Sequence, residues 1–171
     1  MSEQSQTVAA VKTAIQMEID GKTFYQRAAQ ASPNALGKKL FRQLAAEEDI
    51  HRQKFEEIFK AIQARKPWPD IKITPDQGKH LQTLFSSASK NVQSSASEME
   101  AAQTAMNMEN KTRDFYHEQA QKANFAAEKD YYLALEQQES SHHAALYEYY
   151  EYLKDPAGWF TMKERHSLDG G

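Results

Sequence analysis

Two stretches of the sequence decide the fold: Ala14–Tyr25, AIQMEIDGKTFY, and Ala105–Tyr116, AMNMENKTRDFY. They align without a gap at an offset of 91 residues. A second motif repeats at the same offset, since Glu48-Asp-Ile-His51 aligns with Glu139-Ser-Ser-His142. The chain therefore consists of two related halves, each carrying an isolated glutamate followed thirty residues later by a Glu-x-x-His motif.

Outside these motifs, apolar residues recur at the spacing of one helix face over four long segments. Ser32-Pro33 has the residue types of a helix N-cap and first helical position, and Ser97 and Glu100 have the spacing of a capping box. Asp155-Pro156 favours a helix end. The predicted helices cover Ser5–Ala31, Pro33 to about Ala64, Ser97 to about Ala123, and a fourth segment that ends before Asp155.

A crossover of about residues 65–97 separates the second predicted helix from the third. Within it, Thr74-Pro75-Asp76-Gln77 is typical of the capped start of a short helix that includes Leu81, Leu84 and Phe85. Two helical hairpins joined by a long crossover predict an all-α, ferritin-like four-helix bundle in which the second and third helices are parallel. We expect one domain over residues 1–171, with a C-terminal tail from about 156 to 171; periodicity alone equally allows an ordinary bundle with no site.

Composition excludes several function classes. The 171 residues contain no cysteine, which excludes disulfides, zinc ribbons, Cys-ligated iron–sulfur centres and thiol nucleophiles. The formal net charge of −3 gives no general reason to bind nucleic acid or an anionic membrane. The N-terminal sequence lacks the features of a signal peptide, and no stretch has the roughly 20 apolar residues of a membrane span, so we expect a cytoplasmic location.

The repeat places four glutamates at one level of the bundle. Glu18 and Glu48 each lie fifteen residues from Pro33, and the two equivalent glutamates lie fifteen residues from Asn124. At about 1.5 Å per residue, each is roughly 22 Å from its hairpin turn. Apolar residues seven positions away, such as Val11 for Glu18, indicate that all four point inward.

Four buried carboxylates need compensating charge. Two divalent cations would neutralise them, and the histidine of each Glu-x-x-His motif would add one nitrogen ligand per metal. One glutamate from each of two helices plus Glu-x-x-His from each of the other two is the ligand set of ferritin-like di-iron and di-manganese proteins. We therefore predict two iron ions, with manganese or a mixed iron–manganese pair as alternatives. The competing interpretation is a coincidence of surface charges.

With these motifs the chain resembles the rubrerythrin branch of the ferritin-like superfamily over nearly its whole length, including the tail residues Tyr152–Phe160 and Leu168–Gly171. The resemblance implies roles for eight residues. Glu48 and Glu139 would bridge the metals, Glu18 and Glu109 would be terminal ligands, His51 and His142 would each bind one metal, and Tyr25 and Tyr116 would donate hydrogen bonds to the ligands.

Two departures from the family pattern stand out. Full-length rubrerythrins carry a rubredoxin-type Cys-x-x-Cys iron domain that delivers electrons, and these residues contain no cysteine. Because of this first departure, any reductant would be a separate molecule. The second departure is Thr112: rubrerythrins usually have a further glutamate at this position, three residues after the ligand of the third helix. The other histidines, at positions 80, 117, 143 and 166, have no partner at ligand spacing.

The resemblance predicts a di-iron oxidoreductase that reduces hydrogen peroxide with electrons from an external donor such as a rubredoxin-type protein. One alternative is a ferroxidase or iron-storage protein that oxidises Fe(II) with oxygen or peroxide. The second is a structural or sensory dinuclear site without turnover. We expect a homodimer that binds neither nucleic acid nor a membrane.

Overall fold

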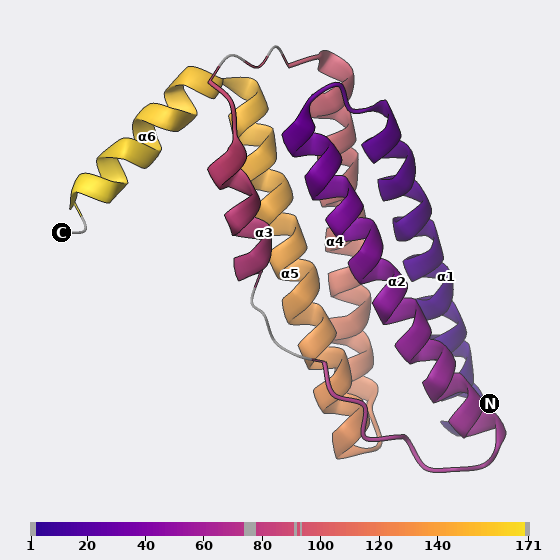
Figure 1. Cartoon of the computed structure of the whole chain (residues 1–171). Coiled ribbons are helices and arrows are strands. Elements are labelled where there is room, and N and C mark those ends of the chain that lie inside the picture. Colours follow the sequence, from indigo (N-terminus) through magenta and orange to yellow (C-terminus); the bar gives the residue numbers. More distant parts are fainter. Residues whose placement is uncertain (1–2, 74–77, 91, 93, 170–171) are drawn as a thin grey trace.

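The structure, a computed structural model, describes residues 3–73, 78–90, 92 and 94–169. Its four long helices lie side by side (Figure 1). They are α1 (Glu3–Ala31), α2 (Ala35–Gln63), α4 (Ala96–Lys122) and α5 (Ala126–Lys154). The crossover between α2 and α4 contains α3 (Lys79–Thr83) and the 3-10 turn η1 (Leu84–Ser87), and α6 (Pro156–Asp169) follows α5.

The arrangement is the all-α ferritin-like bundle that the sequence predicts. Helices α1 and α2 form one hairpin, α4 and α5 form the other, and α3 lies along α5 in the crossover (Figure 1). The described residues contain no β-strand. No helix among them is long and apolar enough to cross a membrane.

The predicted start of the second helix is wrong by two residues. Helix α2 begins at Ala35, and its N-cap is Asn34, whose side chain accepts a hydrogen bond of 2.6 Å from the Gly37 backbone N–H. Ser32 does not cap the helix because its buried hydroxyl donates instead to Glu98, at 3.1 Å. A cap can use either residue type, and the contact with the other hairpin decides between them.

The predicted capping box of the third helix is also displaced by two residues. Ser95 and Glu98 form the box, not Ser97 and Glu100. Both pairs have the required spacing, but only the observed one turns its glutamate into the protein, where Glu98 is 4% exposed. The Glu98 carboxylate also accepts from the Asn34 side chain at 2.5 Å, so the start of α4 is joined to the start of α2.

The segment predicted as a C-terminal tail contains helix α6, which turns away from the four long helices (Figure 1). Asp155 caps it, since its carboxylate accepts from the Gly158 N–H at 3.0 Å, and Pro156 occupies the first helical position. Asp155-Pro156 therefore ends α5 and starts α6. The sequence prediction included only the first of these two effects.

The predicted helix start at residues 74–77 lies outside the described residues. The short helix α3 begins at Lys79, after Gly78, whose φ of 70° suits glycine. Leu81 and Phe85 are buried, as the apolar spacing predicts, whereas Leu84 is only half-buried.

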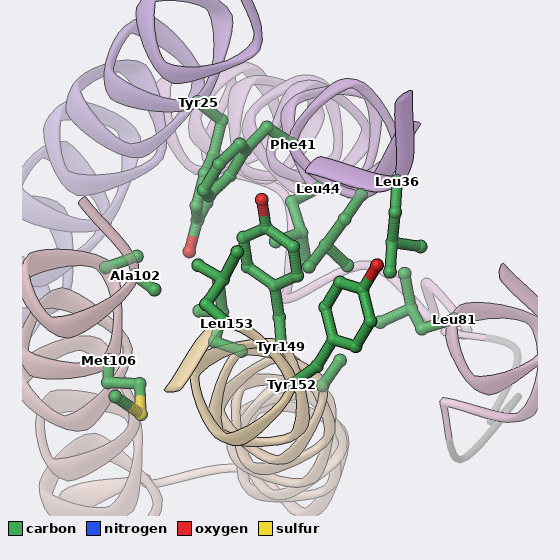
Figure 2. Packing of buried hydrophobic residues seen from close by; sticks show 14 of the residues in the cluster. Tyr25, Leu36, Phe41, Leu44, Leu81, Ala102, Met106, Tyr149, Tyr152 and Leu153 are labelled. Atoms are coloured by element: carbon green, nitrogen blue, oxygen red, sulfur yellow. The ribbon is translucent and has the colours of Figure 1, made fainter. Parts of the chain in front are cut away.

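The hydrophobic core consists of two clusters. One contains Phe41, Leu44 and Tyr149 (Figure 2) and extends to Ala29 and Leu36, on either side of the turn between α1 and α2. The other contains Phe55, Tyr116 and Leu135. A layer of buried polar side chains separates the two clusters. On α2, for example, Glu48 and His51 lie between Leu44 of the first cluster and Phe55 of the second. This polar layer is the candidate functional site.

Candidate metal centre

The six charged residues singled out by the repeat come together in the bundle interior. Each of the four long helices contributes a glutamate, and α2 and α5 each add the histidine one turn later. None is more than 4% exposed. They are Glu18, Glu48, His51, Glu109, Glu139 and His142.

These residues form two overlapping groups whose ligand atoms lie within 4.8 Å of one another. The first consists of Glu18, Glu48, His51 and Glu139. The second replaces Glu18 and His51 by Glu109 and His142. Glu48 and Glu139 belong to both groups, so the geometry is that of two adjoining cation sites sharing two carboxylates.

The imidazoles face the carboxylates through Nδ1. His51 Nδ1 is 3.5 Å from Glu18 Oε2 and 3.4 Å from Glu139 Oε1. His142 Nδ1 is 3.2 Å from Glu48 Oε1 and 3.3 Å from Glu139 Oε2. The two rings are nearly parallel, with centroids 5.9 Å apart. Each imidazole therefore presents one nitrogen to one of the two groups.

Most of the atoms that face one another in this layer have no hydrogen-bond partner among the described residues. A buried polar atom without a partner is costly, and several around one point indicate a ligand of opposite charge. Oxygen and nitrogen donors in this ratio suit divalent iron, manganese or zinc. The unpaired atoms are Glu18 Oε2, Glu48 Oε1, both carboxylate oxygens of Glu139, and Nδ1 of His51 and of His142.

Crowding shifts the ionisation of the metal-free cluster. Burial and neighbouring carboxylates raise the pKa of Glu48 well above its ordinary value and that of Glu109 to about 8. Glu139 shifts the other way: burial would raise its pKa, but its interactions with the neighbouring Glu109 and His142 side chains lower it. Burial would lower the pKa of His51 and of His142, but adjacent carboxylates raise both. The cluster thus retains protons where a metal would bind.

Two tyrosines from the repeated stretches donate hydrogen bonds to the outer carboxylates, which are those of Glu18 and Glu109. The Tyr25 hydroxyl donates to Glu109 Oε1, and the Tyr116 hydroxyl donates to Glu18 Oε1. Each tyrosine thus holds a glutamate of the opposite half of the repeat. This leaves the second oxygen of each outer carboxylate turned toward the cluster.

Two further side chains, not predicted from the sequence, contact the Nε2 atoms of the imidazoles. His51 Nε2 pairs with Gln138 Oε1, and His142 Nε2 lies 2.8 Å from Glu47 Oε2. His80, from the crossover, contacts the other oxygen of Glu47. Gln138 and Glu47 are themselves 91 residues apart, directly before the two central glutamates, so the repeat contained the signal for them. Nothing in the sequence pattern signalled His80.

A cleft of about 390 Å³ reaches this outer side of the cluster. His51, His142 and Glu47 line it together with His80 and Lys54. The metal-facing Nδ1 atoms point the other way, toward the carboxylates. The cleft therefore ends at the outer edge of both imidazoles, which are themselves almost fully buried.

Thr112 occupies the position where the family usually has a further glutamate. Its hydroxyl donates to the Met108 carbonyl oxygen of its own helix at 3.1 Å. His117, by contrast with the cluster histidines, is exposed and pairs with Glu136. His117 belongs to neither of the two groups that could hold a cation.

We predict that the metal-free protein loses stability as pH rises from 4.5, the ordinary value for glutamate, to about 8, the value at Glu109. A group whose pKa is higher in the folded state stabilises the fold while protonated, and this contribution disappears as pH rises through the folded pKa. Glu48, His51 and His142 act in the same direction. Melting temperatures of chelator-treated protein across this range measure the effect, and metal-loaded protein is the control. A melting temperature that rises with pH in the chelated sample would contradict the prediction.

We predict that Gly21→Ala weakens metal binding without destabilising the metal-free fold. A Cβ at position 21 would lie 2.7 Å from Glu48 Oε2, so the shared carboxylate has to move. Alanine is favoured over glycine within a helix by about 1 kcal/mol, which offsets this strain in the absence of metal. Affinity should fall about tenfold or more, the scale seen when an outer support of a metal ligand is lost.

Isothermal titration and urea unfolding measure these two effects separately. Asp20→Ala, at the exposed neighbouring position, is the control and should leave metal affinity unchanged. Equal affinities in Gly21→Ala and the parent protein would show that Glu48 need not keep its position.

Comparison with known families agrees with this geometry. The model of the rubrerythrin family matches residues 10–150, which include all six clustered residues and both tyrosines. No curated protein and no solved structure matches the chain. The family match covers well over half of the sequence and spans both halves of the repeat, so the chain belongs to the rubrerythrin family.

Proposed function

We propose that this protein reduces hydrogen peroxide to water with a pair of iron ions held by the six-residue cluster. The observation that carries the proposal is that Glu48 and Glu139 are shared between two buried groups, each completed by one glutamate and one histidine. Two iron(II) ions bound there would supply the two electrons needed to cleave one O–O bond. Manganese, or one ion of each kind, would fit the same donors.

The protein's own residues would position the ions and separate them from solvent. Glu48 and Glu139 would contact both ions, while Glu18 with His51 and Glu109 with His142 would complete one ion each. The two apolar clusters lie on either side of this layer, which limits escape of reactive oxygen into the bundle.

Outer hydrogen bonds would keep the ligands in place during turnover. Tyr25 and Tyr116 hold one oxygen of each terminal carboxylate. Glu47 accepts the Nε2 proton of His142, so that Nδ1 of this imidazole can bind metal. Electrons would come from a carrier such as a rubredoxin-type protein, since these 171 residues contain no cysteine to hold a rubredoxin-type iron.

Stopped-flow mixing of anaerobic, iron(II)-loaded protein with peroxide tests the proposal. We expect two iron(II) ions to be oxidised per peroxide, and much slower oxidation when oxygen replaces peroxide. Glu48→Ala should lose the reaction, whereas Glu136→Ala, on the outer side of α5, should retain it. Iron that stays reduced, or equal oxidation in Glu48→Ala, would refute peroxide reduction at this site. Faster oxidation by oxygen would favour iron handling instead.

A further inference from the structure

A line of aromatic rings leads from the metal centre to the base of α6. Consecutive ring centroids lie between 5.4 and 6.4 Å apart, which is direct contact between rings. Figure 2 shows the first four side chains. In order from the metal centre they are Tyr25, Phe41, Tyr149, Tyr152 and Trp159.

The line joins the cluster to the molecular surface. At its inner end, the Tyr25 hydroxyl donates a hydrogen bond to Glu109, one of the six clustered residues. At its outer end, Trp159 is 6% exposed and lies beneath the ammonium of Lys163, 5.5 Å from the ring centroid. The Lys163 side chain is itself 53% exposed and pairs with Glu148.

Each oxidisable ring between Phe41 and the surface has a hydrogen-bond acceptor. The Tyr149 hydroxyl donates to Glu98 at 3.0 Å, and the Tyr152 hydroxyl donates to the Ser89 carbonyl oxygen at 2.6 Å. The Trp159 indole N–H donates to Glu148 at 2.9 Å. Loss of one electron makes a phenol or an indole strongly acidic, so an acceptor for its proton makes the oxidation easier. Packing alone would be satisfied by phenylalanine.

The second hydrophobic cluster contains a similar line without these acceptors. Tyr116 contacts Tyr132 at 6.0 Å, and Tyr132 contacts Trp68 at 5.7 Å. Neither the Tyr132 hydroxyl nor the Trp68 indole N–H has a hydrogen-bond partner among the described residues. The protein thus contains two aromatic lines of similar spacing, of which the one ending at Trp159 is equipped to release protons.

We propose that Tyr149, Tyr152 and Trp159 form an electron path that supplies one electron to the metal centre. The inference rests on the proposed function, because its oxidant is hydrogen peroxide. It applies when the metal centre can supply only one of the two electrons that the reduction of one peroxide requires. Peroxide then takes up one electron from the centre, one from the path and two protons from solvent, giving two waters. The side chains of the path thereby complete a reduction that would otherwise release a radical.

At the outer end of the path, each electron that leaves an aromatic ring is accompanied by a proton, so no net charge remains on the ring. Tyr149 supplies the electron that reaches the centre, and the electron deficit is then shared among Tyr149, Tyr152 and Trp159. While Trp159 is oxidised, its indole proton passes to Glu148. A soluble one-electron reductant of the thiol or ascorbate class returns an electron to Trp159, and Glu148 returns the proton. Phe41 and Tyr25 carry no lasting charge in this scheme; they fill the space between Tyr149 and Glu109.

A flash-photolysis experiment tests the path without peroxide. Met162→Cys, at a position on α6 that is 54% exposed, provides a unique thiol for a ruthenium photo-oxidant, because the chain has no cysteine of its own. The full-length protein is loaded with redox-inert Zn²⁺, so that any radical belongs to a side chain. A tryptophan radical should form first and decay as a tyrosyl radical appears.

Variants assign these signals. The double replacement Tyr149→Phe and Tyr152→Phe should abolish the tyrosyl signal and prolong the tryptophan radical. Tyr132→Phe is the matched control on the other line, and both signals should persist in it. A tryptophan radical that never passes to tyrosine, or a tyrosyl signal that survives the double replacement, would overturn the path.

Peptide mass spectrometry of iron-loaded protein tests the path with peroxide itself. Without an external reductant, oxygen addition should concentrate at Trp159 and spare Trp68, the other tryptophan of the chain. Tyr149→Phe should remove this preference. Equal oxidation of both tryptophans would count against the path, whereas peroxide that is not consumed at all would refute the proposed function and leave the flash experiment to decide on the path.

Discussion

Glu139→Ala is expected to abolish the binding of both metal ions, not of one. Glu139 belongs to both cation groups, and neither of its carboxylate oxygens has a hydrogen-bond partner among the described residues. Its removal takes one ligand from each ion and leaves His51 and His142 without the carboxylate they share. Affinity should fall by more than about a hundredfold, beyond what the loss of an outer support produces.

Elemental analysis of dialysed protein and isothermal titration measure this loss. Glu136→Ala is a matched control, since it removes a glutamate side chain from the same helix, one turn earlier. Glu136 pairs with the exposed His117. The control should bind two ions per chain. If Glu139→Ala retained one ion at the parent affinity, the two sites would be independent, contrary to the shared-carboxylate geometry.

Glu98→Ala is expected to cause a large loss of stability in the part of the bundle away from the metal layer. Its carboxylate accepts hydrogen bonds from Ser32, Asn34 and Tyr149 and also forms the capping box of α4. Alanine leaves three donors without their acceptor, and an unsatisfied buried donor costs about 1–3 kcal/mol. The free energy of unfolding should therefore fall by about 3 kcal/mol or more.

Urea unfolding of the metal-free protein measures this change. Glu100→Ala is the natural comparison, because Glu100 is exposed on the same helix and is the glutamate that spacing alone assigns to the capping box. Its replacement should change stability by no more than about 0.5 kcal/mol. Equal losses in the two variants would mean that the contacts of Glu98 contribute nothing beyond helix propensity.

The repeat is the reason why the cluster could be predicted from sequence. An offset of 91 residues fixes which positions are equivalent, and helix geometry then places Glu18 beside Glu48 without any knowledge of tertiary contacts. The structure brings all six predicted residues together. Periodicity of the four long segments was likewise sufficient for the all-α bundle.

Helix starts could not be predicted because they depend on contacts between the halves. Ser32 and Asn34 are both suitable caps, and Ser95 and Ser97 both precede a glutamate by three residues. What decides is the burial of Glu98 between α2, α4 and α5, a tertiary contact that local spacing does not encode. His80 escaped prediction for the same reason, since it reaches Glu47 from the crossover.

Helix α6 was not predicted either, but for a different reason. Its N-cap and first residue, Asp155 and Pro156, are local signals that sequence reasoning can use. They were read only as the end of α5. Trp159, one turn into α6, packs on Tyr152 and Phe85, so this short helix extends the core beyond the four-helix bundle.

Anomalous diffraction at the iron edge, from crystals grown with iron(II) under anaerobic conditions, would locate the metal ions themselves. We expect two peaks inside the bundle, one next to Glu18 and His51 and the other next to Glu109 and His142. Glu48 and Glu139 should contact both. A single peak, or iron bound only at the exposed surface while the six residues keep their metal-free contacts, would contradict a dinuclear centre in this protein.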